Sequence, residues 1–136
     1  MALKPPVVVE MEWSGELAFS AHVGKTSLVL DSSGATGGSP VDLLATALTG
    51  CMAMDLAFIL TKGRYTYRAL RTRLVAERAP DVPHRITAVA LHFTIDGDVP
   101  ADAVSRGLQL SREKYCSVWH SMRQDIDLQV TFDLNP

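Results

Sequence analysis

The strongest constraint on the fold of this chain is one long apolar segment with helix signals at both ends. Ser39 and Pro40 are residue types preferred at the N-cap and at the first position of a helix, and Asp42 completes a capping box. Gly63 is typical of the position just after a helix. Between these ends the segment is apolar nearly all round, which predicts a helix from Pro40 to Lys62 that is buried on most sides.

A segment of this length also has to be tested as a membrane span, because about 20 apolar residues cross a bilayer. Asp42 and Asp55 lie within it, and an aspartate deep in a lone span costs about 2.5–3.5 kcal/mol on insertion scales. The flanking segments alternate apolar and polar residues and need a surface to pack on. The sequence therefore favours a core helix and predicts no membrane partner.

Alternation of apolar and polar residues predicts strands on both sides of the helix. The expected strands cover residues 7–13, 17–23, 26–30, 65–77, 84–96 and 126–132. A Gly- and Ser-rich loop, predicted to be mobile, precedes the long helix, and two shorter helices are expected at 101–114 and 117–123. The order βββ-α-ββ-α-α-β predicts a single α+β domain over residues 1–136 with an antiparallel sheet.

Composition excludes some function classes. The net charge is −2 and the sequence pI about 6.0. Lys and Arg form no cluster, so nothing in the charge pattern favours a nucleic-acid partner. The first residues have no apolar region of signal-peptide type, which predicts a cytoplasmic location. In that compartment a pair of cysteines is more often catalytic or metal-binding than a structural disulfide.

The chain has two cysteines, and only the fold can bring them together. Cys51 lies within the long apolar helix, and Cys116 lies 65 positions later. A cysteine in an apolar helix is most often a small core residue, so Cys51 alone would be structural. Two thiols that meet can instead act as a redox pair, since a thiol that reaches a sulfenic acid makes its formation reversible. Both interpretations are open from the residues alone.

Cys116 and His120 are four positions apart, a spacing at which two side chains on one helix face can bind the same metal ion. Two ligands are too few for a tetrahedral site, and no nearby Cys/His pair completes the set. The sequence therefore predicts no metal and no cofactor.

Three motifs resemble the OsmC/organic hydroperoxide resistance family. They are Ser39-Pro40-Val41-Asp42-Leu43-Leu44, then Gly50-Cys51 in the same helix, then Glu113-Lys114-Tyr115-Cys116-Ser117. The end of the helix, Lys62-Gly63-Arg64, resembles the YhfA-like branch of that family. The resemblance covers nearly the whole chain.

This resemblance implies an intertwined homodimer, with antiparallel sheets wrapped around long central helices and active sites at the subunit interface. It also implies a thiol-dependent peroxidase. Cys51 would attack an organic hydroperoxide and become a sulfenic acid, and Cys116 would resolve it to a disulfide. An external dithiol, a lipoyl group in some relatives, would restore both thiols. An apolar wall suited to an organic substrate is expected from Leu48, Met52, Met54 and Phe58.

The groups that activate the cysteine in characterised relatives are not in their usual places. Those enzymes use an arginine from an N-terminal strand turn and a glutamate right after the helix-opening proline. Here Val41 follows Pro40, and the first arginine is Arg64. The candidates for stabilising a thiolate are Arg112, Lys114, Arg64 (from a second copy of the chain), Asp42 and Glu113.

Local reasoning favours Cys116 as the acidic thiol. It precedes a predicted short helix, with Arg112 and Lys114 just before it, and cations and helix N-termini favour a thiolate. The roles of the two cysteines could then be reversed relative to the family.

Three functions are consistent with these observations. The first is a thiol peroxidase, favoured by the cysteine pair. The second is a non-catalytic redox sensor or a binding module for a small apolar or electrophilic ligand, favoured by the missing arginine and glutamate. The third is a two-thiol reductase or transferase with another substrate.

Overall fold

The computed structural model describes residues 3–136, and the chain forms two compact units. The first ends at Leu44 and the second runs from Ala45 to Pro136, so the boundary falls within the long helix. The prediction that residues 1–136 form a single domain stays a prediction. We describe the two units separately.

The first unit is built on a three-stranded antiparallel sheet in the order β1-β2-β3. Its strands are β1 (Val9–Gly15), β2 (Ala18–Val23) and β3 (Thr26–Asp31). The loop after β3, expected to be mobile, is held by the Asp31 carboxylate. That carboxylate accepts hydrogen bonds from the backbone N–H and hydroxyl groups of Ser33 and Thr36, at 2.6 to 3.0 Å. These four bonds hold the pKa of Asp31 well below its usual value.

The long helix, α1 (Pro40–Lys62), begins and ends where the sequence predicts. The backbone N–H of Asp42 donates to the Ser39 hydroxyl at 3.1 Å, and the backbone N–H of Ser39 donates to the Asp42 carboxylate at 3.2 Å. These reciprocal bonds form the capping box. At the other end the Gly63 N–H closes the last turn on the carbonyl of Ile59.

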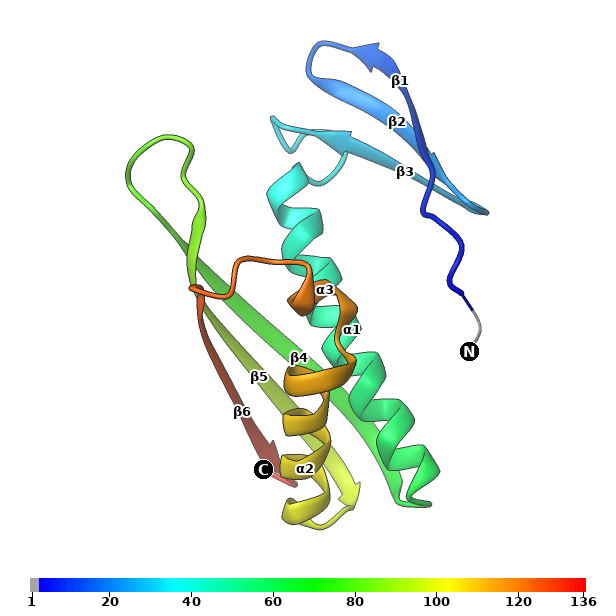
Figure 1. Cartoon of the computed structure of the whole chain (residues 1–136), viewed down its shortest axis with the longest axis vertical. Coiled ribbons are helices and arrows are strands. Elements are labelled where there is room, and N and C mark those ends of the chain that lie inside the picture. The colour runs from blue at the N-terminus through cyan, green and yellow to red at the C-terminus, as the bar shows by residue number, and fades with distance from the viewer. Residues whose placement is uncertain (1–2) are drawn as a thin grey trace. The chain divides into compact units, whose positions relative to one another are not determined.

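The second unit packs helices on a three-stranded sheet in the order β4-β5-β6 (Figure 1). Its further elements are β4 (Thr66–Arg78), β5 (Ile86–Asp98), α2 (Ala101–Leu110), the π-helical turn η1 (Ser111–Tyr115), α3 (Ser117–His120) and β6 (Asp127–Leu134). The α+β class and the order of elements are confirmed. The two shorter helices differ from the prediction: the first changes to π geometry after Leu110, and the second ends at His120 rather than at residue 123.

The sequence predicted an antiparallel sheet, but the sheet of the second unit is mixed. β4 pairs with β5 in the antiparallel sense, but β5 and β6 run parallel, with Ala88 opposite Asp127 and Ile95 opposite Leu134. Parallel neighbours need a long crossover connection rather than a hairpin. The segment from α2 to α3 supplies that crossover, and it lies over the same face of the sheet as α1 (Figure 1). Cys116 lies within this segment, between η1 and α3.

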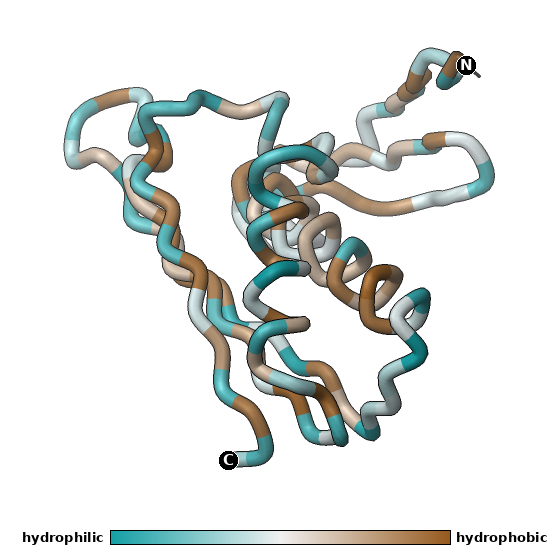
Figure 2. The backbone as a smooth tube through the Cα atoms, turned by 60° about the horizontal axis from the view of Figure 1, so that its bottom comes forward, coloured by the Kyte–Doolittle hydropathy of each residue, from teal (hydrophilic) through white to brown (hydrophobic). Residues whose placement is uncertain are grey.

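The core of this unit lies between the sheet and α1 and α2. Apolar residues recur along the strands and α1 (Figure 2). The inward-facing residues of the central strand are Val89, Leu91, Phe93 and Ile95, all at most 2% exposed. The α2 backbone approaches α1 closely at Gly107, where a Cβ would stand 3.0 Å from the Leu56 side chain. A small residue is therefore needed at the point where the two helices pack.

Only one side of α1 is buried in the single chain, so the expectation of burial on most sides is wrong for one copy. Leu48, Met52, Leu56 and Leu60 form a buried stripe at every fourth position. On other faces of the helix Met54 is 73% and Phe58 66% exposed. A helix that is apolar on all sides is expected to be buried, but its composition does not determine whether its own chain or another molecule covers each side.

By length and composition α1 is a helix that could cross a membrane, a test that core helices of globular proteins also pass. Its buried stripe lies in the core of the second unit, and Leu56 contacts α2 at Gly107. These contacts are those of a core helix. The absence of a membrane partner stays a prediction.

Candidate functional site

The candidate site begins with one turn of α1. Cys51 and Asp55 are four positions apart, so they lie on the same side of the helix, one turn from each other. Both are partly buried, and they border the buried stripe that contains Met52 and Leu56. Packing of the buried stripe thus fixes the positions of the Cys51 thiol and the Asp55 carboxylate but leaves both partly exposed.

A π-helical turn supplies the other half of the site. In η1 the backbone N–H of Cys116 donates to the carbonyl of Ser111 at 2.8 Å, a bond that spans five residues. π-helical turns are rare in proteins, and where they occur they often lie at functional sites. Cys116 then caps α3, because its sulfur accepts a hydrogen bond from the backbone N–H of Trp119 at 3.3 Å. The cysteine side chain is held from both directions along the chain.

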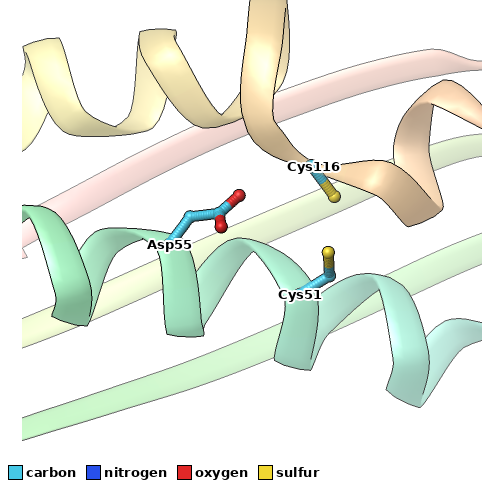
Figure 3. A group of neighbouring side chains, drawn as sticks. All are labelled: Cys51, Asp55 and Cys116. Atoms are coloured by element: carbon cyan, nitrogen blue, oxygen red, sulfur yellow. The ribbon is translucent and has the colours of Figure 1, made fainter. Parts of the chain in front are cut away.

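The two turns meet side by side, so that the side chain of Cys116 faces Cys51, with Asp55 one turn further along α1 (Figure 3). The Ser111 hydroxyl donates to Asp55 Oδ2 at 2.7 Å. The two sulfur atoms and a carboxylate oxygen of Asp55 all lie within 4.8 Å of one another. Both cysteines are free thiols. The fold therefore brings together two thiols that are 65 positions apart in the sequence.

The surroundings of Cys116 correct the prediction that it is the acidic thiol. The pKa of Cys116 is raised to about 11, chiefly by burial. The hydrogen bond from the Trp119 N–H lowers it, and Cys51 and then the Asp55 carboxylate raise it. The position at a helix N-terminus, foreseen from the sequence, is real, but α3 has only four residues. A fully buried sulfur close to a carboxylate outweighs that effect.

The two cations next to Cys116 in sequence point elsewhere. Arg112 Nη1 donates to the carbonyl of Leu128 on β6 at 2.8 Å. Lys114 Nζ lies over the ring of Tyr115, 5.4 Å from its centre. Within residues 3–136, the Cys51 sulfur lies 3.9 Å from the Ser117 hydroxyl, and the Cys116 sulfur accepts a hydrogen bond from the Trp119 N–H. Neither of these partners is a cation.

The remaining residues proposed to stabilise a thiolate also have other surroundings in the single chain. The Asp42 carboxylate caps α1. Glu113 accepts a hydrogen bond from Gln109 at 3.1 Å. Arg64 is exposed and lies beyond the end of α1, 13 positions after Cys51, which is about 20 Å along a helix. Their roles towards the thiols remain predictions, and Arg64 could act only from a second copy.

The predicted apolar wall is divided between two sides of α1. Leu48 and Met52 are core residues with at most 1% exposure and cannot line a substrate site. Phe58 instead borders an open hollow of about 360 Å³ next to Asp55. The hollow is lined by Asp55, Phe58, Ile59, Lys62, Leu110 and Tyr115. Its lining is mostly apolar and shares Asp55 with the cysteine site.

Sequence reasoning gave too little weight to Asp55 and did not find Ser111. The signal that could have found Asp55 is the Cys-x-x-x-Asp spacing, which puts Asp55 one turn from Cys51 on the predicted helix. Its closeness to Cys116 was not foreseen. The π-helical turn that sets Ser111 against Asp55 has no comparable signal in the sequence.

Comparisons with known proteins agree with this structure. The family model described as "OsmC-like protein" matches residues 32–131. The protein YhfA of Escherichia coli K12 is 32% identical over 127 residues, which cover 91% of this chain and 95% of YhfA. A hypothetical protein from Aquifex aeolicus VF5 has a similar fold, with a TM-score of 0.90 at 23% identity over 97% of this chain and 98% of that one.

A peroxide-related protein is among the structural relatives. The organic hydroperoxide resistance protein OhrB of Bacillus subtilis superposes with a TM-score of 0.61 at 13% identity, over 94% of this chain and 98% of OhrB. At this identity the match shows the fold alone. Together, the family model and the adjacent cysteine pair indicate a redox- or peroxide-related function. The chain belongs to the OsmC-like family.

Proposed function

We propose that the protein is a thiol-dependent peroxide reductase that acts on organic hydroperoxides through Cys51 and Cys116. The observation that carries the proposal is the meeting of two free thiols at the junction of α1 and η1, within 4.8 Å of each other. One sulfur is accessible and the other is enclosed. A nucleophile and a resolving thiol need this arrangement.

Cys51 is the peroxide-reactive thiol in this mechanism because it is the partly exposed one. Its thiolate attacks the terminal oxygen of the hydroperoxide, the O–O bond breaks, and the alcohol leaves after taking up a proton. The sulfur is oxidised to a sulfenic acid and the peroxide is reduced. Cys116, 0% exposed, is shielded from solvent oxidant until this step is complete.

Cys116 then attacks the sulfenic sulfur of Cys51. A disulfide forms, and the sulfenic oxygen leaves as water after taking the thiol proton of Cys116. The two sulfur atoms need to approach from within 4.8 Å to the disulfide bond length of about 2.05 Å. An external dithiol reduces the disulfide by thiol exchange and is itself oxidised to a disulfide. A lipoyl-type dithiol remains our prediction for this reductant.

The hollow next to Asp55 supports an organic substrate. Phe58, Ile59, Leu110 and Tyr115 offer an apolar surface next to Asp55, which itself lies beside both sulfur atoms. Such a surface favours the organic group of an alkyl or aryl hydroperoxide over hydrogen peroxide.

A homodimer is part of the proposal. In one copy the exposed side of α1 carries Met54 and Phe58, one helical turn apart. Exposed apolar side chains grouped in this way mark an interaction site. A second copy would cover it and would add charged groups near Cys51, for which Arg64 is our candidate. The cytoplasmic location is likewise a prediction.

The proposal is tested by counting free thiols after mixing the reduced protein with cumene hydroperoxide. The wild type is expected to lose two thiols per chain quickly. Cys116→Ser is expected to lose one and to accumulate a sulfenic acid that dimedone traps. Cys51→Ser, which keeps only the enclosed thiol, is expected to lose none on that time scale. Loss in the wild type no faster than for a free thiol in solution would rule the enzyme out.

A non-catalytic redox sensor or ligand-binding dimer is the second candidate. It is favoured by the raised pKa of Cys116 and by the directions of Arg112 and Lys114, which point away from the thiols. The same experiment separates the two candidates. A sensor forms one disulfide and does not turn over, whereas the enzyme consumes many equivalents of hydroperoxide when a dithiol is supplied in excess.

A further inference from the structure

The junction of α1 and η1 gathers three potential metal ligands rather than two. The sulfur atoms of Cys51 and Cys116 and a carboxylate oxygen of Asp55 lie within 4.8 Å of one another. In the sequence, Cys116 and His120 have the spacing of metal ligands, but two ligands are too few for a tetrahedral site. His120 in fact donates from Nε2 to the carbonyl of Arg112. Asp55, from the facing helix, is the third donor.

The distances suit a tetrahedral ion. With Zn–S bonds of about 2.3 Å and Zn–O bonds of about 2.0 Å, ligand atoms in a tetrahedral zinc site stand about 3.5–3.8 Å apart. The three atoms here are at most 4.8 Å apart, so each pair has to close by no more than about 1.0–1.3 Å. Side-chain rotation on the two packed turns can supply a change of that size.

The charge balance of the cluster also favours a cation. The three groups are all acidic, and the hydrogen bonds described for the two sulfur atoms include none from an arginine or lysine side chain. Because the three ligand atoms lie within 4.8 Å of one another, negative charges on them repel. A metal ion bound by all three groups would remove this repulsion.

The carboxylate is already oriented by a second contact. The buried Ser111 hydroxyl donates to Asp55 Oδ2, and Ser111 is 0% exposed. Carboxylates that bind metals are commonly held by such outer hydrogen bonds, and removing them weakens binding. The site is thus built from two packed turns and one supporting hydroxyl group.

We propose that Cys51, Asp55 and Cys116 bind a thiophilic divalent cation of the Zn²⁺ type, with the fourth position open to solvent or to a ligand. Two thiolates select soft or borderline ions such as Zn²⁺ over Mg²⁺ or Ca²⁺. Three protein ligands with one open position are the pattern of reactive rather than structural zinc sites. The proposal needs no peroxidase activity and goes beyond it.

The test is a competition titration of the reduced, metal-free protein with Zn²⁺ against a chromophoric chelator, without oxygen. We expect one ion per chain. Cys51→Ser and Cys116→Ser should each weaken binding by about a hundredfold or more, and Asp55→Asn by at least about tenfold, since even outer contacts are worth 10- to 100-fold. Asp102→Asn makes the same charge change on the exposed start of α2 and should leave the affinity as in the wild type.

Co²⁺ gives a readout that a general loss of stability would not imitate. In the wild type it should show thiolate-to-metal absorption together with the strong visible bands of a tetrahedral ion. Each single cysteine variant should lose about half of the thiolate absorption, because one of the two sulfur ligands is gone. Cys116→Ala serves as a second variant at the buried position, and circular dichroism monitors the fold of each protein.

Two results would overturn the proposal. One is Zn²⁺ binding by the wild type that is no tighter than binding by the Cys51→Ser/Cys116→Ser double variant. The other is an affinity of Asp55→Asn equal to that of Asp102→Asn, which would remove Asp55 as a ligand. Neither result bears on the peroxidase, because thiol loss with cumene hydroperoxide is measured separately on the metal-free protein.

Discussion

The α1 turn that carries Cys51 and the π-helical turn that carries Cys116 meet at one site, but they give their sulfur atoms different surroundings. Cys51 is partly exposed on the border of the buried stripe of a long helix. Cys116 is fully buried, caps α3, and has a pKa raised to about 11. A pair of this kind can divide the work: one thiol meets the oxidant and the other is kept back until a sulfenic acid forms.

The largest expected difference between the two turns is the rate at which their thiols are alkylated. In reduced native protein, Cys116→Ser leaves only Cys51 and Cys51→Ser leaves only Cys116. We expect iodoacetamide to modify Cys51 at least about tenfold faster, because Cys116 is fully buried and burial is the largest cause of its raised pKa. Mass spectrometry of timed samples measures both rates.

The control for this comparison is the same reaction in denaturant, where the two rates should become similar. Comparable rates in the native protein would mean that the π-helical turn opens readily, and the division of roles between the thiols would fail.

The next effect is a pH dependence of stability that comes from Cys116. Its pKa is higher in the folded protein than the ordinary 9.0, so its contribution is fully present below pH 9 and is lost as the pH rises towards 11. The loss relative to Cys116→Ala should be about 2 kcal/mol, because each pKa unit corresponds to 1.36 kcal/mol. Urea unfolding with chelator and reductant, at pH 8 and at pH 11, measures it.

A difference between wild type and Cys116→Ala that stays constant from pH 8 to pH 11 would contradict this prediction. It would show that the folded protein tolerates the Cys116 thiolate, and the contrast between the two thiols would rest on exposure alone.

The smallest effect compares two serines of the site. Ser111→Ala removes a fully buried hydroxyl that donates to the Asp55 carboxylate, and should destabilise the protein by about 1–3 kcal/mol. Ser117→Ala removes an exposed hydroxyl that lies 3.9 Å from the Cys51 sulfur, and should change stability by less than about 0.5 kcal/mol. Equal effects in urea unfolding would mean that the Ser111 bond does not hold the two turns together.

The ends of the long helix and the buried face of the central strand could be predicted from residues close together in the sequence. Ser39, Asp42 and Gly63 carry the signals of helix ends, and these signals depend on neighbours within a few residues. The alternation along β5 likewise places Val89, Leu91, Phe93 and Ile95 on one face. Both patterns express backbone geometry that is present in the chain before it packs.

The remaining features depend on contacts between distant segments. Alternation along β6 is the same for a parallel and an antiparallel partner, so the parallel pairing with β5 could not be predicted from it. The guanidinium of Arg112 donates to the carbonyl of Leu128 on β6, so its closeness to Cys116 in the sequence wrongly suggested a charge partner for that thiol. Only the packing of α1 against η1 brings Asp55 to Cys116.

The most direct test of the cysteine pair is the product of one oxidation. The reduced, metal-free protein is treated with one equivalent of cumene hydroperoxide and digested without reductant, and its peptides are analysed by mass spectrometry. We predict one linked pair of peptides, joined through Cys51 and Cys116, with water and the alcohol as the other products. Cys51 oxidised to a sulfinic acid while Cys116 remains a free thiol, or both thiols unchanged, would contradict the account.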